Sequence, residues 1–317
     1  MANRNFNTSV SIIIVNYNTR KLLSDCLHSI YEQTKDISFE VIVSDNGSTD
    51  GSIEMLKNDF PQVILIENNA NLGFGAANNR GLSIAKGKYI LYLNSDTILL
   101  NNAVKIFFDY FEKNGEKENI GALGTNLIGA DEKPSWSYGS IYGEFSSTQE
   151  LLSDRTKLLI GSYKAAIRHY VFRKKLREVT QKKTVSYYTG IVGYISGADL
   201  FMLNNDSARF DENIFLYYEE TDLEYQLTKN GFNCILIDSA KIMHLEGGSE
   251  KKPALEVLDL ASFAKINLFK SCIYFFKKNK LATPLQIFRL KLITLLIWLN
   301  PLIVKKTKGF IIPMLKI

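Results

Sequence analysis

The sequence predicts an α/β protein built on a mostly parallel sheet flanked by helices, a Rossmann-like architecture. Over the first hundred residues, short apolar runs rich in Val and Ile alternate with segments of helical periodicity. Such alternation is typical of parallel strands joined by crossover helices. The apolar runs are continuous, as expected for strands covered on both faces. With 317 residues, 46% of them hydrophobic, the chain suffices for one large core and a smaller appendage.

The individual elements follow from local patterns. A helix is predicted over 20–34 because Leu22, Leu23, Cys26, Leu27 and Ile30 recur at helical spacing. By the same reasoning, strands are predicted at 10–17, 39–46, 62–68 and 88–96, and further helices at 50–58 and 75–86.

The pattern changes after residue 144. Lys and Arg interleave with apolar and aromatic residues over 145–183, which predicts a basic helical insertion or a mobile loop within a first domain of residues 1–250. Regular structure is expected again over 189–204, with a helix at 219–229, a strand at 232–238, a loop at 241–249 and helices from 255 onward.

Charge separates a tail, residues 251–317, from this domain. The tail holds 13 Lys and Arg against 2 Asp and Glu, whereas residues 1–250 hold 25 against 31. Such a basic tail suits an anionic membrane surface or a nucleic acid, but no nucleic-acid recognition motif is present. Its apolar run, 292–304, is too short to span a bilayer, which takes about 20 residues.

The apolar run is bordered by basic residues, namely Arg289, Lys291, Lys305, Lys306 and Lys308. An amphipathic, basic and aromatic-bearing segment of this kind is expected to lie in the interface of an anionic leaflet. The alternative is a helical element that covers a core or forms a homodimer.

The N-terminal residues and the cysteines indicate the cellular compartment. Residues 1–9 are polar and the first apolar run is short, so we expect no secretory signal. Cys26, Cys234 and Cys272 lie in apolar surroundings without metal-type spacing, as expected for buried free thiols. The prediction is a cytoplasmic protein associated peripherally with the inner face of the plasma membrane.

Polar residues follow each of the first four predicted strands. They are Asn16-Tyr17-Asn18 after the first, Asp45-Asn46-Gly47-Ser48 after the second, Asn68-Asn69 with Asn71-Leu72-Gly73 after the third, and Asn94-Ser95-Asp96 after the fourth. Any one such group is explained by a turn. Because open sheets of this kind bind ligands at the carboxyl ends of their strands, four in succession predict a shared cleft.

Three features carry possible chemistry. Asp45 can accept the N3–H of uracil or thymine, or form an Asx turn before a helix near Asp50. Asp96 can hold Mg²⁺ or Mn²⁺ together with a diphosphate, or act as a helix N-cap before Ile98. His244, after a predicted strand, can complete a metal shell or be structural.

Acidic residues Glu219, Glu220, Asp222 and Glu224 open the predicted helix at 219–229. Negative charge is favoured there by the helix dipole. A carboxylate at this place also has the chemistry of a general base toward an acceptor hydroxyl.

Together, in this order, the stretches "VSIIIVNYNTRKLLSDCLHSI", "VIVSDNGSTDGS", "NLGFGAANNRG", "YILYLNSD" and "GADLFML…FDENIFLYYEETDLEYQL", with a following His, resemble the family-2 glycosyltransferases of the GT-A fold. The resemblance covers about residues 10–250. It is closest to the bacterial rhamnosyltransferase-like branch that assembles cell-surface polysaccharides.

The resemblance implies an inverting, metal-dependent hexosyltransferase and assigns roles to particular residues. Glu220 would be the catalytic base, with Glu219 and Asp222 beside it. Asp96 and His244 would bind the divalent metal, Mn²⁺ or Mg²⁺. The donor would be dTDP-rhamnose or, alternatively, a UDP-sugar, and the acceptor a lipid-linked saccharide. The donor site would comprise Asn16, Tyr17, Asn18, Asp45, Asn46, Gly73, Asn78, Arg80, Asn94 and Ser95.

The sequence departs from the family pattern at three places. The first acid of the Asp-x-Asp motif is Asn94, and the usual Glu-Asp pair is Glu219-Glu220. Asn78 stands where many relatives carry Arg, so the resemblance leaves the diphosphate contact to Arg80 or to another group, including the basic insertion.

Other classes of protein fit less well. A dinucleotide oxidoreductase needs a Gly-x-Gly-x-x-Gly after the first strand, where Asn16-Tyr17-Asn18 stands. A nucleotidyltransferase usually has a Gly-rich basic loop there, which is also absent. A non-catalytic sugar-nucleotide-binding or scaffold protein remains as an alternative because of Asn94 and Glu220.

Overall fold

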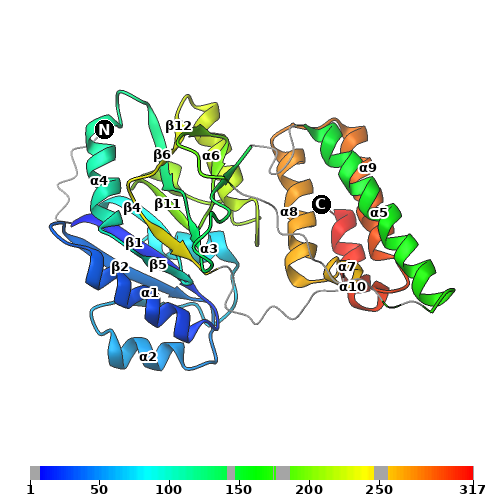
Figure 1. The fold of residues 1–317 in the computed structure, drawn as a ribbon, viewed down its shortest axis with the longest axis horizontal. Helices are drawn as coiled ribbons and strands as arrows, with labels where there is room; N and C mark the ends of the chain where they lie inside the picture. The colour runs from blue at the N-terminus through cyan, green and yellow to red at the C-terminus, as the bar shows by residue number, and fades with distance from the viewer. Residues whose placement is uncertain (1–7, 141–146, 174, 176–185, 246–255, 317) are drawn as a thin grey trace. The chain divides into compact units, whose positions relative to one another are not determined.

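The computed structural model describes residues 8–140, 147–173, 175, 186–245 and 256–316. Its main feature is an eight-stranded sheet in the order β3-β2-β1-β4-β11-β6-β12-β9 (Figure 1). The pairs β1–β2, β1–β4, β2–β3 and β6–β12 are parallel, whereas β11 and β9 run antiparallel to their neighbours. The strands are β1 Thr8–Asn16, β2 Phe39–Asp45, β3 Ile64–Glu67, β4 Gly87–Asn94, β6 Ile120–Thr125, β9 Gly190–Val192, β11 Asp199–Leu203 and β12 Asn233–Ile237.

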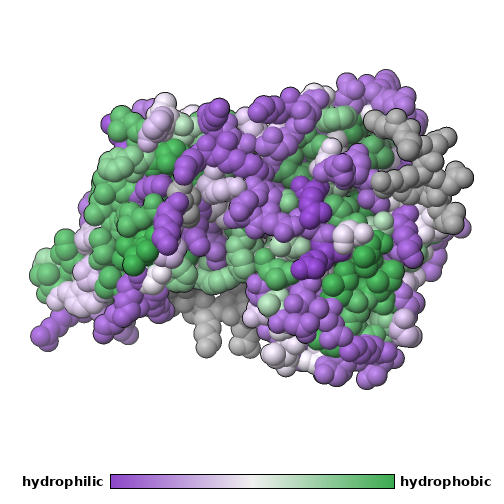
Figure 2. All heavy atoms as spheres, turned by 180° about the vertical axis from the view of Figure 1, so that it is seen from behind, coloured by the Kyte–Doolittle hydropathy of each residue, from purple (hydrophilic) through white to green (hydrophobic). Residues whose placement is uncertain are grey.

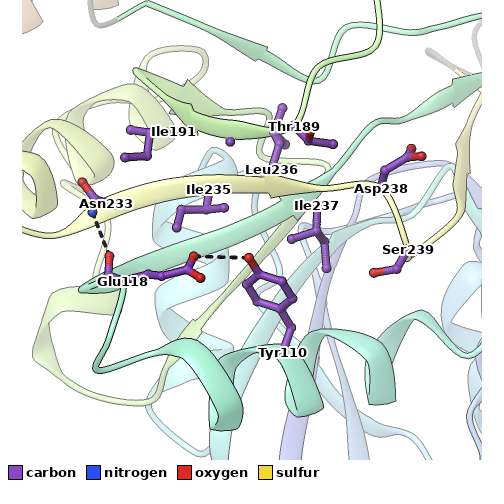
Figure 3. A pocket seen from close by; sticks show the side chains of 11 residues that line it. Tyr110, Glu118, Thr189, Ile191, Asn233, Ile235, Leu236, Ile237, Asp238 and Ser239 are labelled. Atoms are coloured by element: carbon purple, nitrogen blue, oxygen red, sulfur yellow. Dashed lines mark hydrogen bonds between the residues drawn. The ribbon is translucent and has the colours of Figure 1, made fainter.

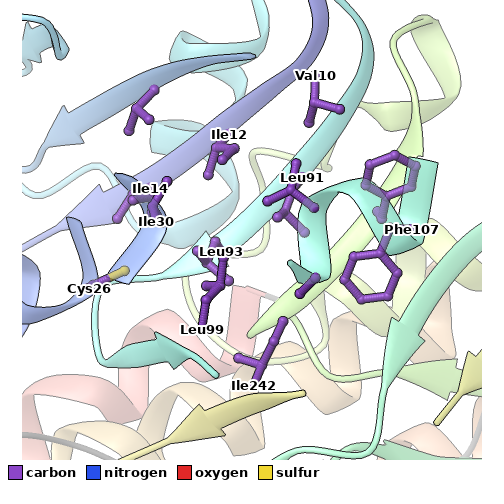
Figure 4. Packing of buried hydrophobic residues seen from close by; sticks show 14 of the residues in the cluster. Val10, Ile12, Ile14, Cys26, Ile30, Leu91, Leu93, Leu99, Phe107 and Ile242 are labelled. Carbon is purple, nitrogen blue, oxygen red and sulfur yellow. The ribbon is translucent and has the colours of Figure 1, made fainter. Parts of the chain in front are cut away.

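Helices cover both faces of this sheet, as the continuous apolar runs predict. One core joins Ile12 and Leu91 of the sheet to Ile30 and Phe107 of the helices (Figure 4). The opposite face carries a second core with Ile13. The helices on the first face are α1 Arg20–Gln33, α2 Ser52–Asp59 and α4 Ala103–Asn114, and those on the second are α3 Phe74–Leu82 and α6 Glu219–Lys229. This arrangement confirms the predicted fold class.

Two smaller sheets accompany the eight-stranded sheet. The first has the order β5-β13-β7 and the second pairs β8 with β10. The prediction of a loop at 241–249 is therefore wrong for its first part, because His244 ends a strand that pairs with the segment after Asp96. The elements are β5 Thr97–Leu99, β7 Ile128–Gly129, β8 Tyr138–Gly139, β10 Tyr194–Ile195, β13 Ile242–His244 and the 3₁₀ turn η1 Asp206–Ala208.

The chain divides into two compact units. The first comprises residues 1–141, 184–215 and 219–249, and the second residues 142–183, 216–218 and 250–317. The predicted basic insertion thus contributes to the second unit, in which its described part forms α5 and packs against α9; residues 145–146, 174 and 176–183 lie outside the described residues. The helices of this unit, hereafter the helical unit, are α5 Thr148–Tyr170, α7 Glu256–Asp259, α8 Phe263–Lys278, α9 Pro284–Trp298 and α10 Val304–Lys316.

The apolar run 292–304 does not form one surface helix. It spans the end of α9, the following turn and the first residue of α10. Ile297, Trp298 and Ile303 are buried, so the aromatic ring of this run serves the core of the helical unit. The sequence could not show this because apolar residues on the inner and outer faces look alike. Among the described residues, none of the helices has both the length and the apolar character needed to cross a membrane.

Phe201 lies at the centre of an aromatic cluster that joins the sheet to α4. Its fully buried ring stacks on Tyr89 and on Phe107, with ring centroids 5.1 and 5.5 Å apart. Phe201→Ala should lower the free energy of unfolding by about 3–5 kcal/mol, because it removes a large buried apolar group and leaves a cavity. Urea denaturation followed by circular dichroism measures this. Leu203→Ala, on the same strand but 36% exposed, is the control and should cost less than about 1 kcal/mol; equal losses would contradict the packing role.

Candidate active site

The register of the parallel strands brings the predicted site residues together. Asn16 at the end of β1 lies opposite Asp45 at the end of β2, and Val15 lies opposite Asn94 at the end of β4. Three of the four predicted polar groups therefore occupy one edge of the sheet. This is the edge at which ligands bind in folds of this type.

A chain of hydrogen bonds runs across these strand ends. The Asn16 side chain donates from Nδ2 to Asp45 Oδ2 at 2.7 Å and accepts from Thr19 Oγ1 at 2.6 Å. The Thr19 hydroxyl is in turn 2.9 Å from the Ser95 hydroxyl. Asn16 and Asp45 are fully buried. The chain fixes β1, β2 and β4 relative to one another at the point where the site begins.

Asp45 forms an Asx turn. Its Oδ1 accepts the backbone N–H groups of Gly47 and Ser48 at 3.0 and 2.8 Å. The helix after this turn begins at Ser52, whose backbone N–H is accepted by Asp50. Of the two roles considered for Asp45 in the sequence, the structure thus shows the Asx turn. Contact of Asp45 with a nucleotide base stays a prediction.

The loop between β3 and α3 is built on an asparagine network. Asn46 donates to the side chain of Asn71 and to the carbonyl of Gly73, at 3.3 and 3.2 Å. Gly73 has φ +88°, a conformation that glycine adopts without strain. A Cβ at this position would lie 2.3 Å from the carbonyl oxygen of Phe215, which accepts the N–H of Phe74. Only glycine therefore allows residue 215 to approach the start of α3.

The remaining donor-site predictions lie at different depths. Tyr17 is 49% exposed. Asn18 has φ +56°, donates its backbone N–H to Ser48 Oγ and accepts the backbone N–H of Thr49 at its Oδ1. Asn78 is buried and donates to the carbonyl of Phe74 in its own helix, whereas Arg80 is exposed in the last turn of α3. Their contacts with a donor stay predictions.

Asp96 and His244 meet where β4 ends. The His244 Nε2 atom is 3.3 Å from Asp96 Oδ1, and both side chains are about 15% exposed. Strand β13 places them, since Leu245 donates its N–H to the carbonyl of Asp96. The alternative of an N-cap is wrong, because Asp96 precedes strand β5 rather than a helix. The two residues predicted to share a metal therefore lie side by side.

The Asp96–His244 pair fits a divalent cation. Two donor atoms bound to one octahedral ion at about 2.1 Å lie about 3.0 Å apart, close to the observed separation. Carboxylate oxygens suit Mg²⁺ and Mn²⁺, and such ions usually take further ligands from phosphate and water. Among the described residues no group of three or more His, Cys, Asp or Glu side chains is placed to hold a metal by itself.

The acidic pair at the start of α6 has two different environments. Glu219 is 4% exposed, and burial together with the charge of Glu220 raises its pKa well above the usual value. Its Oε2 has no hydrogen-bond partner among the described residues. Glu220 is partly exposed, and burial raises its pKa to about 7. Of the two carboxylates, Glu220 is the more exposed.

Contacts between neighbours connect Glu220 to the strand ends. A Cβ built on Gly197 would lie 3.8 Å from Glu220 Cβ and 3.3 Å from the ring of Phe74. The next residue, Ala198, accepts the backbone N–H of Asn94 at 3.1 Å. Glu220, the start of α3 and the end of β4 are therefore parts of one region.

Two further buried acids were not predicted as site residues. Asp199 accepts the N–H of Thr125, and Glu224 accepts that of Ile195. Burial raises the pKa of both carboxyls well above their usual values. Asp222, which was predicted to lie beside the base, is also buried, at 2% exposed.

No local sequence pattern distinguishes such buried acids from acids on the surface. Thr19 and Gly197 likewise gain their role only from contacts distant in sequence.

A hollow of about 570 Å³ lies elsewhere in the same unit (Figure 3). Tyr110, Glu118, Ile191, Asn233 and Asp238 are among its lining residues. None of the predicted site residues lines it. We therefore place the candidate site at the strand ends, where the polar and titratable groups converge, rather than in this hollow.

Comparisons with known proteins agree with the geometry. Residues 11–179 match the model of the family described as Glycosyl transferase family 2. A poly(ribitol-phosphate) beta-glucosyltransferase of Bacillus spizizenii is 31% identical over 161 residues, which are 49% of this chain and 24% of that protein. An N-acetylglucosaminyl-diphospho-decaprenol L-rhamnosyltransferase of Mycobacterium tuberculosis is 25% identical over 218 residues, which are 64% of this chain and 66% of that protein.

Among solved structures, a mannosyltransferase of Pyrobaculum calidifontis in complex with GDP-Man and Mn²⁺ has a TM-score of 0.52 at 14% identity, covering 98% of this chain and 79% of that one. This likeness confirms the GT-A fold. The matches span 24%, 46% and 38% of three curated relatives. Because the family model matches more than half of the sequence, the chain belongs to glycosyl transferase family 2.

Proposed function

We propose that the protein is an inverting, divalent-metal-dependent glycosyltransferase that moves a sugar, with rhamnose favoured, from a nucleotide sugar to a hydroxyl of a lipid-linked glycan in cell-surface polysaccharide synthesis. The observation that carries the proposal is the Asp96–His244 pair, 3.3 Å apart at the end of β4, in one region with a partly exposed Glu220. The similarity to a rhamnosyltransferase acting on a diphospho-decaprenol acceptor supports the choice of sugar and acceptor.

The donor would lie across the strand ends. The Asx turn of Asp45 and the loop at Gly73 border the place for the nucleotide, with Asn16 holding Asp45 from behind. Asp96 and His244 would hold the cation, which when bound offsets the negative charge that develops on the leaving diphosphate. Uracil and thymine both offer an N3–H, so dTDP-rhamnose and UDP-sugars remain the two donors to compare.

Glu220 would act as the base. Its pKa of about 7 suits a group that takes a proton at neutral pH, because an acid with its usual pKa near 4.5 is a weaker base. The deprotonated carboxylate removes the proton of the acceptor hydroxyl, whose oxygen attacks the anomeric carbon as the bond to the diphosphate oxygen breaks. One displacement inverts the configuration at that carbon.

The helical unit would meet the membrane that carries the acceptor. Figure 2 shows apolar surface on this unit, at the left of the view, among hydrophilic side chains. On α9 and its C-cap residue the exposed apolar side chains recur every three or four positions and form a stripe, namely Leu285, Phe288, Leu292, Leu296 and Leu299. With the basic residues of the tail, this stripe suits the interface of an anionic leaflet on the cytoplasmic side. A homodimer that buries the stripe is the alternative.

Metal dependence is tested on the pair that would hold the cation. Asp96→Ala and His244→Ala should each weaken Mn²⁺ binding, measured by calorimetry with dTDP or UDP present. Loss of a residue that only supports a metal ligand costs about 10–100-fold in affinity, and loss of a ligand itself should cost more. The control is Asp25→Ala, an acid on the exposed side of α1. Sugar transfer that persists in EDTA would contradict the proposal.

The base is tested by a substitution that keeps its shape. Glu220→Gln should lower kcat by about 10²–10⁴-fold while donor affinity is retained, since the amide cannot accept the proton. The control, Glu54→Gln, changes an exposed acid of α2. In the unchanged protein kcat should fall as the pH drops below about 7, because Glu220 becomes protonated there. A Gln variant with near-normal turnover would assign the base elsewhere.

Membrane contact is tested by placing charge on the stripe. The double variant Phe288→Glu, Leu292→Glu should lose flotation with phosphatidylglycerol vesicles, because buried carboxylates are costly and anionic lipids repel them. Leu100→Glu, an equally exposed leucine of the first unit, is the control and should float as before. Loss of a dimer in light scattering, without any vesicle binding by the unchanged protein, would favour the dimer instead.

A further inference from the structure

Glu224 is an acid that the proposed mechanism leaves without a role. It follows Glu220 by four residues, about one turn of α6, so the two side chains lie on the same face of the helix. Glu224 is fully buried, and it lies beyond the first turn, where the helix dipole favours negative charge. Burying a carboxyl group is costly unless hydrogen bonds replace those to water, so its partners indicate what it does.

Glu224 is bonded to the start of a loop that leads to the candidate site. Both of its carboxyl oxygens accept the backbone N–H of Ile195, at 2.9 and 3.0 Å. Ile195 is itself fully buried and ends β10, which packs against α6. The bond therefore fixes the end of β10 to the middle of α6.

The segment from Ile195 to Asp199, hereafter the 195–199 loop, is held at its other end by the sheet. The carbonyl of Ala198 accepts the N–H of Asn94, the last residue of β4, at 3.1 Å. Asp199 accepts the N–H of Thr125, the last residue of β6, at 2.6 Å. The loop thus connects α6 to the carboxyl ends of β4 and β6.

Glu220 lies against the middle of this loop. A Cβ built on Gly197 would lie 3.8 Å from Glu220 Cβ. Asp96, which would hold the cation, follows Asn94 by two residues. The 195–199 loop therefore joins the helix that carries the proposed base to the strand end that precedes the proposed metal ligand. All of these residues belong to the first unit.

Glu224 is a neutral acid at pH 7. Burial raises its pKa well above the usual value, and the charges of Glu220 and Asp199 raise it further. Burial likewise raises the pKa values of Asp199, Glu219 and the thiol of Cys234. Among these described neighbours, Glu220 is thus the group that titrates near neutral pH. Glu224 therefore acts through its hydrogen bond rather than through charge.

We propose that Glu224 is a positioning residue for the transfer reaction: by holding Ile195 against α6, it fixes the Glu220 carboxyl relative to the end of β4. Glu224 does not need to touch either substrate. The inference rests on the proposed role of Glu220 as base. It explains why an acid that the helix dipole does not favour is buried at this place.

Two substitutions separate the hydrogen bond from the acid. Glu224→Gln keeps an oxygen that can accept the N–H of Ile195, whereas Glu224→Leu has a similar volume and no acceptor. Glu224→Leu should lower kcat by about 10–100-fold with the KM for the nucleotide sugar unchanged, because a misplacement of about 1 Å can cost this much. Glu224→Gln should retain most of the activity. The assay follows release of dTDP from dTDP-rhamnose and of UDP from UDP-glucose.

Two further measurements report on the position of the groups. Hydrogen exchange by mass spectrometry should show faster exchange in peptides covering 195–198 for Glu224→Leu and unchanged exchange there for Glu224→Gln. The acidic limb of the kcat–pH profile should stay near pH 7 in Glu224→Gln. In Glu224→Leu it should move to lower pH, because a loosened Glu220 gains water and its pKa falls toward the usual value.

Tyr92→Phe is the matched control in the same unit. It removes a fully buried hydroxyl that donates to the carbonyl of Ala208 at 2.6 Å. A buried polar group left without its partner lowers stability in this variant, as the unpaired N–H of Ile195 does in Glu224→Leu. The control should therefore unfold at a lower urea concentration while its kcat and its exchange at 195–198 are unchanged.

The outcomes separate the two proposals. An unchanged protein without transferase activity, or a fully active Glu220→Gln, would refute the proposed function and with it the positioning role. With that function intact, Glu224→Leu that matches Tyr92→Phe in kcat, exchange and pH profile would refute the positioning role alone. Equal losses of kcat, or equal shifts of the acidic limb, in Glu224→Gln and Glu224→Leu would also refute it, because the acid itself would then be required.

A third substitution covers the case in which Glu224→Leu does not fold. Glu224→Asp keeps the acid but withdraws it from Ile195, because its side chain is one methylene shorter. Its kcat should fall in the same direction, with faster exchange at 195–198. Unchanged kcat and exchange in Glu224→Asp would refute the positioning role.

Discussion

The register of β1 against its two neighbours is the constraint on which the site depends. It sets Asn16 opposite Asp45 and Val15 opposite Asn94. Because side chains alternate between the faces of a strand, a slip of one residue would turn Asp45 and Asn16 to opposite faces and bury polar groups in an apolar core. The interleaved apolar residues prevent such a slip: Ile12 and Ile14 belong to one core and Ile13 to the other. The same packing that stabilises the sheet therefore aligns the strand ends, and the hydrogen bonds from Asp45 to Ser95 keep them aligned.

This constraint explains which features could be predicted from the sequence. The strand ends could be predicted because the apolar runs stop at polar residues. Their meeting at one edge could be predicted because adjacent parallel strands end on the same side of a sheet. The pairing of Asp96 with His244 followed only from the family resemblance, since nearly 150 residues separate them. The structure brings them together through β13, which the sequence did not predict because its three residues are too few to show a pattern. The Asx turn at Asp45 and the asparagine network at Asn46 and Gly73 also depend on contacts that no local pattern reveals.

Burial explains why two adjacent glutamates have different properties. Glu219 faces inward and its carboxyl lacks a hydrogen-bond partner among the described residues, whereas Glu220 is partly exposed and has a pKa of about 7. In the sequence the two residues are equivalent, and both are favourable at a helix N-terminus. Glu224 and Asp199 are buried as well, and burial raises the pKa of each carboxyl well above its usual value, which disfavours the charged form. Burial thus gives the two neighbouring carboxyls different surroundings and raises the pKa of each.

Holding a carboxylate in such a place has an energetic cost, because the folded chain resists burying negative charge. Tyr217 and Tyr218, which precede this pair in the chain, have positive φ values that large side chains rarely adopt. Such a conformation persists only where the surroundings enforce it. The enforcing contacts, from Ser271 to Leu216 and from Tyr218 to Phe275, lie within the helical unit. Helix α8 supplies both contacts and also packs against α9, which carries the exposed apolar stripe.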